Sequence, residues 1–399
     1  MRILFVADGR SPTALNWLRF WTETGNTVHL VSSFPCEKPA GVERFFVLPV
    51  AFSGLARGRK NNLTGGSAQS EFVRYLRDPL RRLRYILGPL SLPFYWTQFR
   101  AIVDGIKPEI VHALRIPFEG MMATATPSDI PLVVSTWGND LTLHARGSFL
   151  MAKMTRQTLA RVDGLIADTR RDAVLGGEWG LRTGKPVLIV PGSGGIRRNE
   201  ITVDTVAVPL PQELPDAPIV VNPRGQRPGS LRQDNFFQAI PLVLQQISQA
   251  VFICPSLKGD PEAEHLVETL GIRERTWLWP RLSQEQLWSL FMKSDIYVSP
   301  SLHDGTPNSL LETMACGCFP VVGDIESMRE WVKDGDNGSL IDATDVHSIA
   351  EAIIKAINQP AMRTKAAGLN ASLIAGRADY GVNMKRVEEF YQLLVQQHM

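Results

Sequence analysis

The segment from residue 299 to residue 331, SPSLHDGTPNSLLETMACGCFPVVGDIESMREW, constrains the fold more than any other part of the sequence. Residues 296–298 and 320–322 are short apolar runs, which predict two buried strands. Between them, Thr306 is a suitable N-cap, Pro307 suits the first helical position, and Gly317 is placed to end a helix. The segment therefore predicts a strand, a tight polar loop, a helix and a second strand.

The predicted loop and helix start form a candidate anion site, because the backbone N–H groups at the positive end of a helix are available to a ligand. Asp304 precedes this helix and Glu312 lies inside it, roughly 9 Å along the axis from the cap. One extended ligand would then contact Asp304 with a sugar hydroxyl, residues 306–310 with phosphates, and Glu312 with ribose hydroxyls. A nucleotide-sugar has this layout. An ordinary buried β–α–β unit with two surface acids accounts for the same pattern.

Length and composition favour a soluble globular chain with two domains. A chain of 399 residues is longer than one hydrophobic core usually supports. A content of 44% apolar and 21% charged residues is typical of globular proteins. The net charge of +2 gives no indication of nucleic-acid binding. The four cysteines form no CxxC pair, which fits a reducing cytoplasm. The N-terminal residues predict a first strand and not a signal peptide, and no apolar run approaches the ~18 residues that cross a membrane.

The first half of the chain alternates predicted strands with helices. Strands are predicted at residues 3–7, 28–31, 109–113, 131–135, 164–168 and 186–190. Gly9 lies in the first loop, which lacks the GxGxxG dinucleotide pattern, so simple turn geometry explains this glycine equally well. In an open parallel sheet the loops at the carboxyl strand ends line the ligand crevice. His112 and the WGND loop with Asp140 are therefore expected there, although a single histidine is more often structural.

Residues 57–100 are strongly basic. Residues 53–70 are polar and rich in glycine, which predicts a loop, and the following arginines are interleaved with leucine, tyrosine, phenylalanine and tryptophan. Such a segment can lie on an anionic membrane surface, or it can be a solvated helix with a stripe that faces the core. Pro79, Pro89 and Pro93 are predicted to break any long helix here.

The second half repeats the β–α alternation after residues 191–218, which are rich in proline and glycine and predict the domain boundary. Strands are predicted at residues 219–221, 251–254, 277–279 and 296–298, and helices at 346–357 and 384–396. The last helix is long enough to pack back on the first domain. Four arginines follow strands, where a guanidinium can bind phosphate in a bidentate manner, although any one of them could be a plain surface charge. They are Arg224, Arg227, Arg232 and Arg281.

These features together resemble the retaining glycosyltransferases of family 4. The resemblance rests on two α/β halves, the D-x7-E pair of HDGTPNSLLE, the REWVKDGDNG segment and the VH…TWGND pattern, and it spans nearly the whole chain. It implies an α/β GT-B fold, with two Rossmann-like domains that face each other across a cleft. Residues 1–200 would form the acceptor-side domain, residues 215–380 the nucleotide-sugar domain, and residues 381–399 a helix that returns to the first domain.

The resemblance also implies roles for single residues. Glu312 would bind the ribose, Asp304 would lie beside the donor sugar, and Gly9 would let the first loop approach the donor. His112 would face the reaction centre from the acceptor side, where Asp140 would position the acceptor, so His112 and Asp304 are the predicted catalytic residues. The predicted donor-binding set is Gly9, Arg224, Arg232, Arg281, Asp304, Gly305, Thr306, Pro307, Asn308, Ser309, Leu310 and Glu312.

The sequence departs from the family pattern at three positions. Asp304 is one methylene shorter than the usual glutamate, GQRPGSLRQDN lacks the usual lysine, and Leu114 stands where many members have a second histidine. The absent lysine leaves the second cation at the diphosphate open between Arg227 and Arg232.

The implied reaction moves a sugar from a nucleoside diphosphate, with UDP favoured by family habit, to a hydroxyl of a glycan or lipid-linked acceptor in polysaccharide or cell-envelope synthesis. Retention of configuration, no metal or other cofactor, no nucleic acid and a cytoplasmic location at the inner membrane face are expected. A catalytically silent GT-B protein that binds a nucleotide or scaffolds an assembly is the alternative, and a membrane adaptor that uses residues 57–100 is a third. An NAD enzyme is disfavoured, because no GxGxxG follows a strand.

Overall fold

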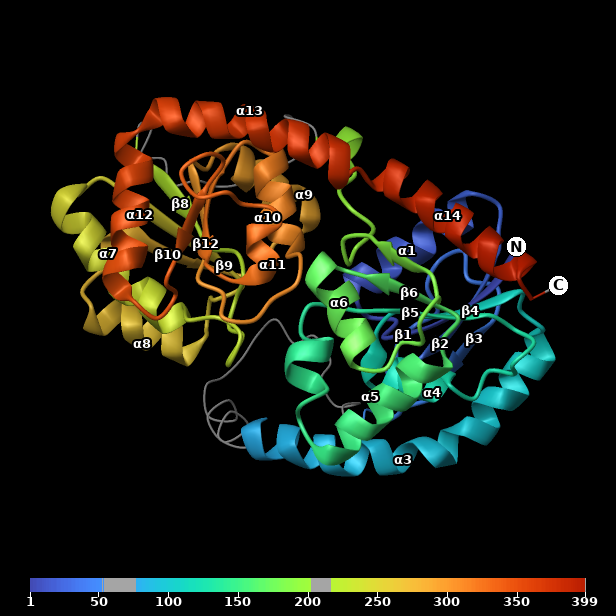
Figure 1. The fold of residues 1–399 in the computed structure, drawn as a ribbon. Helices are drawn as coiled ribbons and strands as arrows, with labels where there is room; N and C mark the ends of the chain where they lie inside the picture. The colour runs from blue at the N-terminus through green and yellow to red at the C-terminus, as the bar shows by residue number, and fades with distance from the viewer. Residues whose placement is uncertain (52, 54–76, 202–216, 399) are drawn as a thin grey trace. The chain divides into compact units, whose positions relative to one another are not determined.

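The computed structural model describes residues 1–51, 53, 77–201 and 217–398 (Figure 1). Contacts divide the chain into two compact units. Unit 1 is Met1–Gly194 with Gly381–Met399, and unit 2 is Gly195–Tyr380. The predicted boundary segment, 191–218, contains this division, although its residues 202–216 lie outside the described part. Most of the predicted loop at 53–70 lies outside it as well.

Unit 1 is built on a seven-stranded parallel sheet with the order β3-β2-β1-β4-β5-β6-β7. The six strands predicted in this half are present, and β3 is an additional strand of only three residues, too short for a periodic pattern. The strands are β1 (Arg2–Ala7), β2 (Thr27–Ser32), β3 (Phe45–Val47), β4 (Ile110–Ala113), β5 (Leu132–Ser135), β6 (Gly164–Ala167) and β7 (Val187–Ile189). The helical segments are α1 (Pro12–Glu23), α3 (Arg77–Ile106), η2 (Ile116–Gly120), α4 (Met121–Ala123), η3 (Asp140–His144), α5 (Phe149–Arg161), α6 (Arg170–Glu178) and α14 (Tyr380–Gln396).

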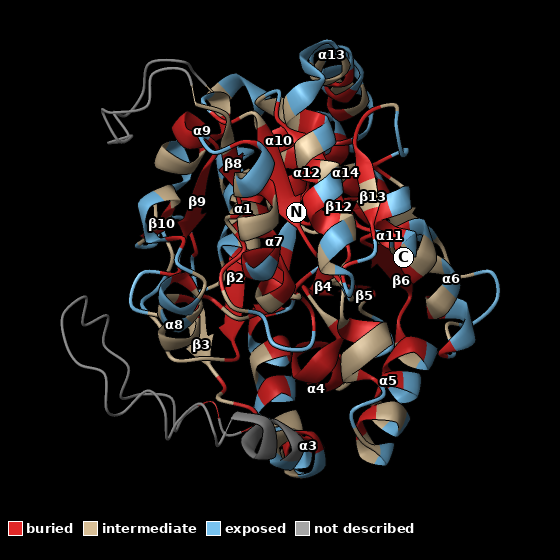
Figure 2. Ribbon diagram, turned by 90° about the vertical axis from the view of Figure 1, so that its left-hand side faces the viewer, coloured by how far each residue is buried: buried red, intermediate tan, exposed pale blue. Residues whose placement is uncertain are grey.

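Helices cover both faces of this sheet. Successive side chains of a strand point to opposite faces, so each strand packs against helices on both sides. Leu4 and Val6 of β1 belong to the core cluster that also holds Phe99 of α3. On the other face, the Phe5 ring contacts the His112 ring, at a centroid distance of 5.7 Å. The inner strands β1, β2, β4, β5 and β6 are almost entirely buried, whereas the edge strands β3 and β7 are partly exposed (Figure 2). Such continuous apolar runs are what a parallel sheet covered on both sides requires.

The prediction that prolines break the helix near residue 89 is wrong. Helix α3 continues from Arg77 to Ile106 through Pro89 and Pro93. Pro89 has no N–H for the carbonyl of Tyr85, four residues earlier. That carbonyl instead accepts a hydrogen bond of 2.7 Å from the hydroxyl of Ser148, which also caps the start of α5. A donor from a neighbouring helix thus replaces the bond that proline removes.

Unit 2 is built on a six-stranded parallel sheet with the order β10-β9-β8-β11-β12-β13. The predicted strands are confirmed, and β13 was not foreseen, because its residues follow a glycine turn. The strands are β8 (Ile219–Val221), β9 (Val251–Pro255), β10 (Thr276–Trp279), β11 (Ile296–Ser299), β12 (Phe319–Gly323) and β13 (Ser339–Ile341). The helices are η4 (Arg198–Glu200), α7 (Gln233–Gln246), α8 (Pro261–Thr269), η5 (Arg273–Arg275), α9 (Gln284–Met292), α10 (Asn308–Ala315), α11 (Glu326–Arg329), α12 (Val346–Asn358) and α13 (Pro360–Arg377).

Two apolar clusters flank the unit 2 sheet. Val298 of β11 packs in the cluster of α7, α8 and α12, whereas its neighbour Tyr297 packs in the cluster of α9 and α10. Both sheets reverse their strand order at one place, between β1 and β4 in unit 1 and between β8 and β11 in unit 2. Ligands of open parallel sheets bind at the carboxyl ends of the strands beside such a reversal. The two α/β units confirm the predicted fold class.

Candidate functional site

The segment around α10 has the predicted order of strand, loop, helix and strand. Leu310, Leu311 and Met314 supply its buried face, and Gly317 follows the last turn at a φ of +92°, which favours glycine. The predicted N-cap role of Thr306 is wrong, and Pro307, predicted at the first helical position, is the N-cap instead. Helix α10 begins at Asn308 after Pro307, without a side-chain cap, and the Thr306 hydroxyl accepts a hydrogen bond of 3.1 Å from Trp331 Nε1.

An arginine and a carboxylate meet at the reversal point of the unit 2 sheet. Arg224 follows β8 and Asp304 follows β11, and Arg224 Nη2 donates to Asp304 Oδ2. The two side chains are 6% and 15% exposed, so the pair is nearly desolvated. Arg224 Nη1 also reaches the Ser309 hydroxyl at 3.4 Å. Burial opposes the charge of Arg224, yet the nearby Asp304 carboxylate raises its pKa.

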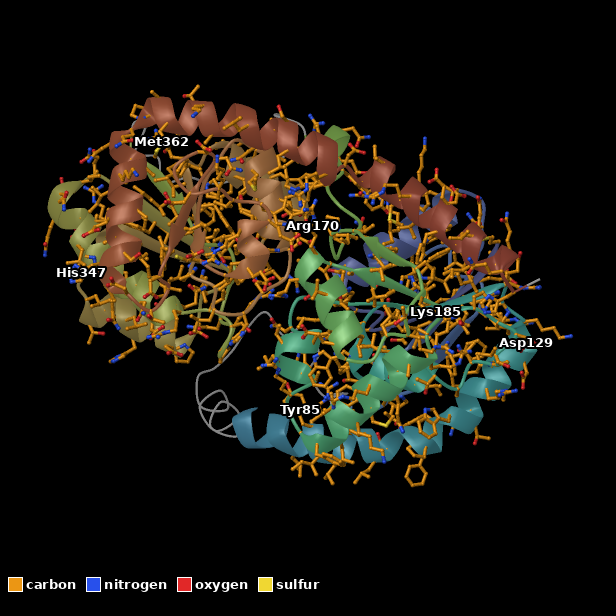
Figure 3. All side chains as sticks on the ribbon, in the orientation of Figure 1. Tyr85, Asp129, Arg170, Lys185, His347 and Met362 are labelled. Atoms are coloured by element: carbon orange, nitrogen blue, oxygen red, sulfur yellow. The ribbon has the colours of Figure 1, made fainter. Side chains whose placement is uncertain are left out.

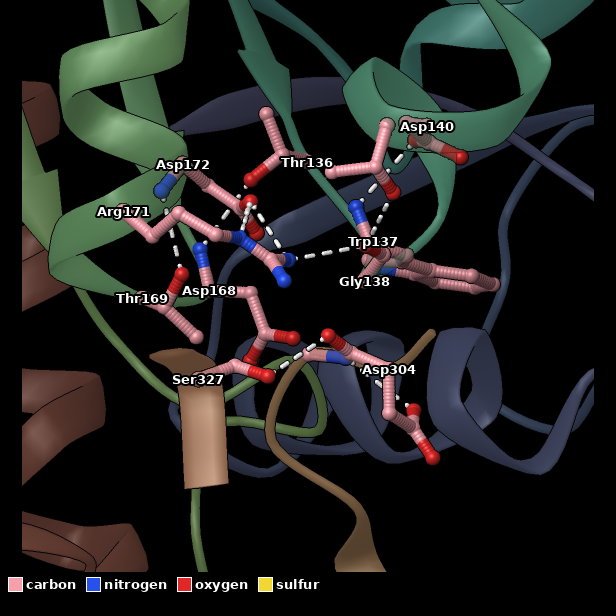
Figure 4. Close-up of polar contacts among 12 residues, drawn as sticks. Thr136, Trp137, Gly138, Asp140, Asp168, Thr169, Arg171, Asp172, Asp304 and Ser327 are labelled. Carbon is pink, nitrogen blue, oxygen red and sulfur yellow. Dashed lines mark hydrogen bonds and ion pairs between the residues drawn. The ribbon is translucent and has the colours of Figure 1, made fainter. Parts of the chain in front are cut away.

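The Asp304 loop is fixed from several sides. Ser327 Oγ donates to the Asp304 carbonyl at 2.8 Å (Figure 4), and Gly305 N donates to Asp304 Oδ1 at 3.0 Å. The Tyr297 hydroxyl lies 3.0 Å from the Ser309 hydroxyl, under the first turn of α10. These bonds hold the Asp304 carboxylate beside the positive end of a helix, where an anion is favoured.

The structure places the other three loop arginines differently. Arg227 is exposed, and its Nε donates to the Arg224 carbonyl at 3.4 Å. The charge of Arg224, together with burial, lowers the pKa of Arg227. Arg232 instead bonds Asp234 at 2.8 Å and Asn235 at 2.9 Å, and Arg281 is exposed in the loop after β10. Of the two arginines that the sequence left open, Arg227 is the one that contacts Arg224.

Glu312 lies on α10, half-buried, where Gln284 of α9 donates to its Oε1 at 2.8 Å. Burial raises the pKa of Glu312 to about 8. A carboxyl with this pKa is largely protonated at neutral pH. Hydrogen-bond donors that face the carboxyl favour its ionised form, which is the better acceptor. Ligand hydroxyl groups would supply such donors.

In unit 1, the structure does not favour the role predicted for His112. The His112 ring is fully buried, with Nδ1 bonded to the Tyr391 hydroxyl and Nε2 bonded to the Ser135 hydroxyl at 2.8 Å. Trp17 packs edge-on against the ring, at a centroid distance of 5.3 Å. Burial lowers the His112 pKa to about 3, so the ring stays neutral. His112 thus ties α14 to β4 and β5.

Gly9 and Asp140 are both in loops at the carboxyl end of the unit 1 sheet. A Cβ on Gly9 would lie 2.7 Å from Cys36 Sγ and 3.1 Å from Ser32 Oγ, so the glycine is needed for close packing of the first loop. Asp140 is buried and its carboxylate accepts bonds from Arg115 Nη2 at 2.6 Å and from two backbone N–H groups. Asp140 thus holds the loops after β4 and β5 together.

The WGND loop is bonded from α6 as well. Arg171 Nη2 donates to the Gly138 carbonyl at 2.9 Å and pairs with Asp172 at 2.8 Å (Figure 4). Trp137 N donates to Asp140 Oδ2 at 3.1 Å. These bonds fix the backbone of the WGND loop at the edge of the sheet.

The described part of the chain lacks the features of two other classes of protein. No group of three or more histidine, cysteine, aspartate or glutamate side chains that could hold a metal ion was found there. None of its helices combines the length and the apolar character needed to cross a membrane.

Comparison with known families gives one match in each unit. The family described as "Glycosyl transferase 4-like" matches residues 79–169, and "Glycosyl transferases group 1" matches residues 230–368. The chain belongs to the GT-B glycosyltransferases of the family 4 type. The second match includes Asp304 and Glu312, and the first includes His112 and Asp140.

Solved GT-B glycosyltransferases share the whole fold. Alr3699/HepE from Anabaena, crystallised with UDP, superposes with a TM-score of 0.72 at 14% identity, over 98% of this chain and all of that one. Sucrose-phosphate synthase from Thermosynechococcus elongatus gives a TM-score of 0.72 at 14% identity, over the full length of both chains. At these identities the likeness concerns the fold alone.

Curated relatives among the glycosyltransferases match over shorter stretches. The D-inositol 3-phosphate glycosyltransferase of Mycolicibacterium smegmatis is 29% identical over 122 residues, which are 30% of this chain and 28% of that protein. The alpha-maltose-1-phosphate synthase of Mycobacterium tuberculosis is 33% identical over 91 residues, or 22% of this chain and 24% of that protein. The aligned region thus spans about a quarter of the length of these relatives.

Proposed function

We propose that this protein transfers a sugar from a UDP-sugar to a hydroxyl group of a glycan or lipid-linked acceptor, with retention of configuration at the anomeric carbon. The observation that carries the proposal is the pair of Arg224 and Asp304 at the strand reversal of unit 2, directly before α10. Structures of the same fold crystallised with UDP, such as Alr3699/HepE, support the choice of nucleotide.

In this proposal the diphosphate lies between the two guanidinium groups and the start of α10. Arg224 is held rigidly by Asp304, and Arg227 adds an exposed positive charge beside it. An anion here would relieve the repulsion that lowers the pKa of Arg227. The developing charge of the leaving group is offset by these arginines and by the helix end, so this mechanism assigns no step to a metal ion.

The remaining donor contacts follow from the same geometry. Asp304, fixed by Ser327 and Gly305, would accept a hydroxyl of the transferred sugar. Glu312 would accept the ribose hydroxyls in its ionised form. Because the His112 ring is buried and neutral, the departing phosphate is the proposed base that takes the proton of the acceptor hydroxyl. Attack and departure on the same face would give retention.

We also propose that α3 rests on an anionic membrane surface, where a lipid-linked acceptor would be found. Leu83, Ile86, Leu90 and Phe94 recur on one helical face and are 49% to 77% exposed, and Phe149 at the start of the adjacent α5 is 81% exposed. Arg146 and Lys153, also exposed, lie within four residues of Phe149. An apolar stripe beside basic side chains suits the headgroup region of such a membrane.

Vesicle sedimentation tests the membrane contact. Protein should pellet with phosphatidylglycerol vesicles at low salt, and Phe94→Ser with Leu90→Ser should release it. Leu369→Ser, which changes an exposed leucine of α13, is the matched control. A failure of the unmodified protein to pellet would remove this part of the proposal without touching the donor site.

A thermal-shift panel of UDP-, GDP- and ADP-sugars, followed by a turnover assay with the sugar that stabilises most, tests the activity. We expect a UDP-sugar to raise the melting temperature most and to be consumed. If a nucleotide-sugar stabilises the protein but is neither transferred nor slowly hydrolysed, the catalytically silent alternative is favoured. No shift with any nucleotide-sugar would contradict both.

A further inference from the structure

Unit 1 contains a cavity of about 390 Å³ at the carboxyl end of its sheet, beside the strand reversal between β1 and β4. Loops after β1, β2, β4 and β5 line it together with α3. Its volume lies in the range of small-molecule sites. The cavity walls are aromatic, with Phe34, Tyr85, Phe118 and Trp137, and two arginines, Arg84 and Arg115, are the cationic side chains of the lining.

Arg84 is held in place by rings. Its guanidinium lies 4.7 Å from the centroid of the Phe118 ring and 5.6 Å from that of Phe34. Phe118 has a φ of +65°, an uncommon value for a bulky residue, and its ring fits against Gly88 of α3, where a Cβ would lie only 2.6 Å away. Packing of the Phe118 ring against α3 offsets the strain of this backbone conformation. The same packing sets the position of Arg84, which lies one turn before Gly88.

The acids around the cavity are already engaged. Asp8 accepts two bonds from Arg10, at 3.0 and 2.9 Å. The Asp140 carboxylate is occupied by Arg115 and two backbone N–H groups. Glu119 accepts a bond of 2.5 Å from the Ser33 hydroxyl, and burial raises its pKa.

The donors, in contrast, are in excess. Within the described residues, Arg84 Nε, Arg115 Nε and Trp137 Nε1 are buried without a hydrogen-bond acceptor. A buried donor that stays unpaired is unfavourable, and a charged one is more so. The lining thus lacks acceptors for these three donors, and Arg84 forms no ion pair within the described residues. A ligand that brings negative charge and acceptor oxygens would correct both.

We infer that this cavity binds an acceptor sugar that carries a phosphate or a carboxylate, with the anionic group at Arg84 and Arg115 and the sugar against the Tyr85 and Trp137 rings. Guanidinium groups bind either anion through charge-assisted hydrogen bonds, and aromatic rings pack well against the apolar face of a sugar. Tyr85, labelled in Figure 3, is oriented by a bond of 2.7 Å between its hydroxyl and His144 Nδ1.

This inference rests on the proposed glycosyl transfer, which gives the cavity an acceptor to bind, and calorimetry on the full chain tests it. Glucose 6-phosphate, glucuronate and glucose are titrated separately, so that the phosphate and the carboxylate are distinguished. We expect at least one of the two anionic sugars to bind about tenfold or more tightly than glucose, as a charge-assisted bond of about 1.5–3 kcal/mol predicts. The inference would be overturned if neither glucose 6-phosphate nor glucuronate binds more tightly than glucose.

Variants of α3 assign the effect to the cavity. Arg84→Met should abolish the preference for the anionic sugar, and Arg84→Lys, which keeps the charge, should restore part of it. Arg100→Met removes an exposed arginine of the same helix, paired with Asp104 at 3.8 Å, and should leave the preference intact. Equal preference in Arg84→Met and in the unmodified protein would also overturn the inference.

UDP binding to each protein is measured in parallel. If UDP binds and no anionic sugar is preferred, the cavity assignment alone fails. If UDP does not bind to the unmodified protein, the proposed function fails.

Discussion

The raised pKa of Glu312 makes the affinity for UDP depend on pH. Ribose hydroxyls donate hydrogen bonds, so they favour the ionised carboxylate over the protonated carboxyl that burial stabilises in the empty site. Binding of UDP must therefore lower the Glu312 pKa and release a proton. By linkage, the affinity must rise as the pH rises toward and through 8.

The size of the effect follows from the pKa of about 8. If only the ionised form is competent, about one tenth of the molecules are ready at pH 7 and about nine tenths at pH 9. The dissociation constant of UDP should then fall about tenfold over this range. Glu312→Gln keeps the shape and the bond partner Gln284 but cannot ionise, so the carboxamide should show none of this gain.

Calorimetric titration of UDP at pH 6, 7, 8 and 9 measures both proteins. UDP has its own titration at low pH, which is common to both, so the ratio of the two constants isolates Glu312. We expect the ratio of the two dissociation constants to change by about tenfold between pH 7 and pH 9. A ratio that stays constant from pH 6 to pH 9 would refute the reasoning, as would a gain of equal size in Glu312→Gln.

Three further substitutions have defined outcomes. Ser148→Ala removes the cap of α5 and the donor to the Tyr85 carbonyl, and should lower the free energy of unfolding by about 1–2 kcal/mol in thermal denaturation. Tyr391→Phe leaves His112 Nδ1 without its buried partner and should cost about 1–3 kcal/mol in the same assay, and no loss would argue against that bond. Asp304→Asn removes the charge beside Arg224, and should reduce sugar turnover by about tenfold or more while UDP still binds; unchanged turnover would exclude Asp304 from the reaction.

Much of unit 2 could be predicted because its signals are local. The short apolar runs, the position of Pro307 and the turn at Gly317 fix β11, α10 and β12 without distant contacts. The same patterns place Asp304 and Glu312 before and within a helix. The side-chain partners could not be predicted this way. Arg224 meets Asp304 across 80 residues of sequence, and only the order of the strands brings them together.

At two places in unit 1, tertiary contacts decide what local sequence patterns could not. Pro89 did not end α3, because Ser148, 63 residues beyond Tyr85, supplies the missing donor. His112 lies at the end of a strand, as predicted, but alternation directs its ring to the face that α14 covers, where Tyr391 bonds it. The pairing of His112 with a residue 279 positions later has no signal in a single sequence.

The cavity residues Arg84 and Glu119 were not singled out by the sequence for a related reason. Arg84 belongs to a run of arginines, and the sequence alone predicts that each of them is a solvated surface charge. Glu119 lies in an irregular segment after β4. Their chemistry emerges only when α3 and the loops after β1, β2 and β4 enclose one space.

Titration of UDP into Arg227→Gln tests the central claim most directly, because Arg227 is exposed and its loss should leave the fold intact. The proposed diphosphate site predicts one UDP per chain and a loss of about 10- to 100-fold in affinity when this charge is removed. Arg273→Gln removes another exposed arginine of unit 2, one paired with Glu264 and Glu268, and should bind UDP like the unmodified protein. Equal affinity in Arg227→Gln and Arg273→Gln would contradict the account.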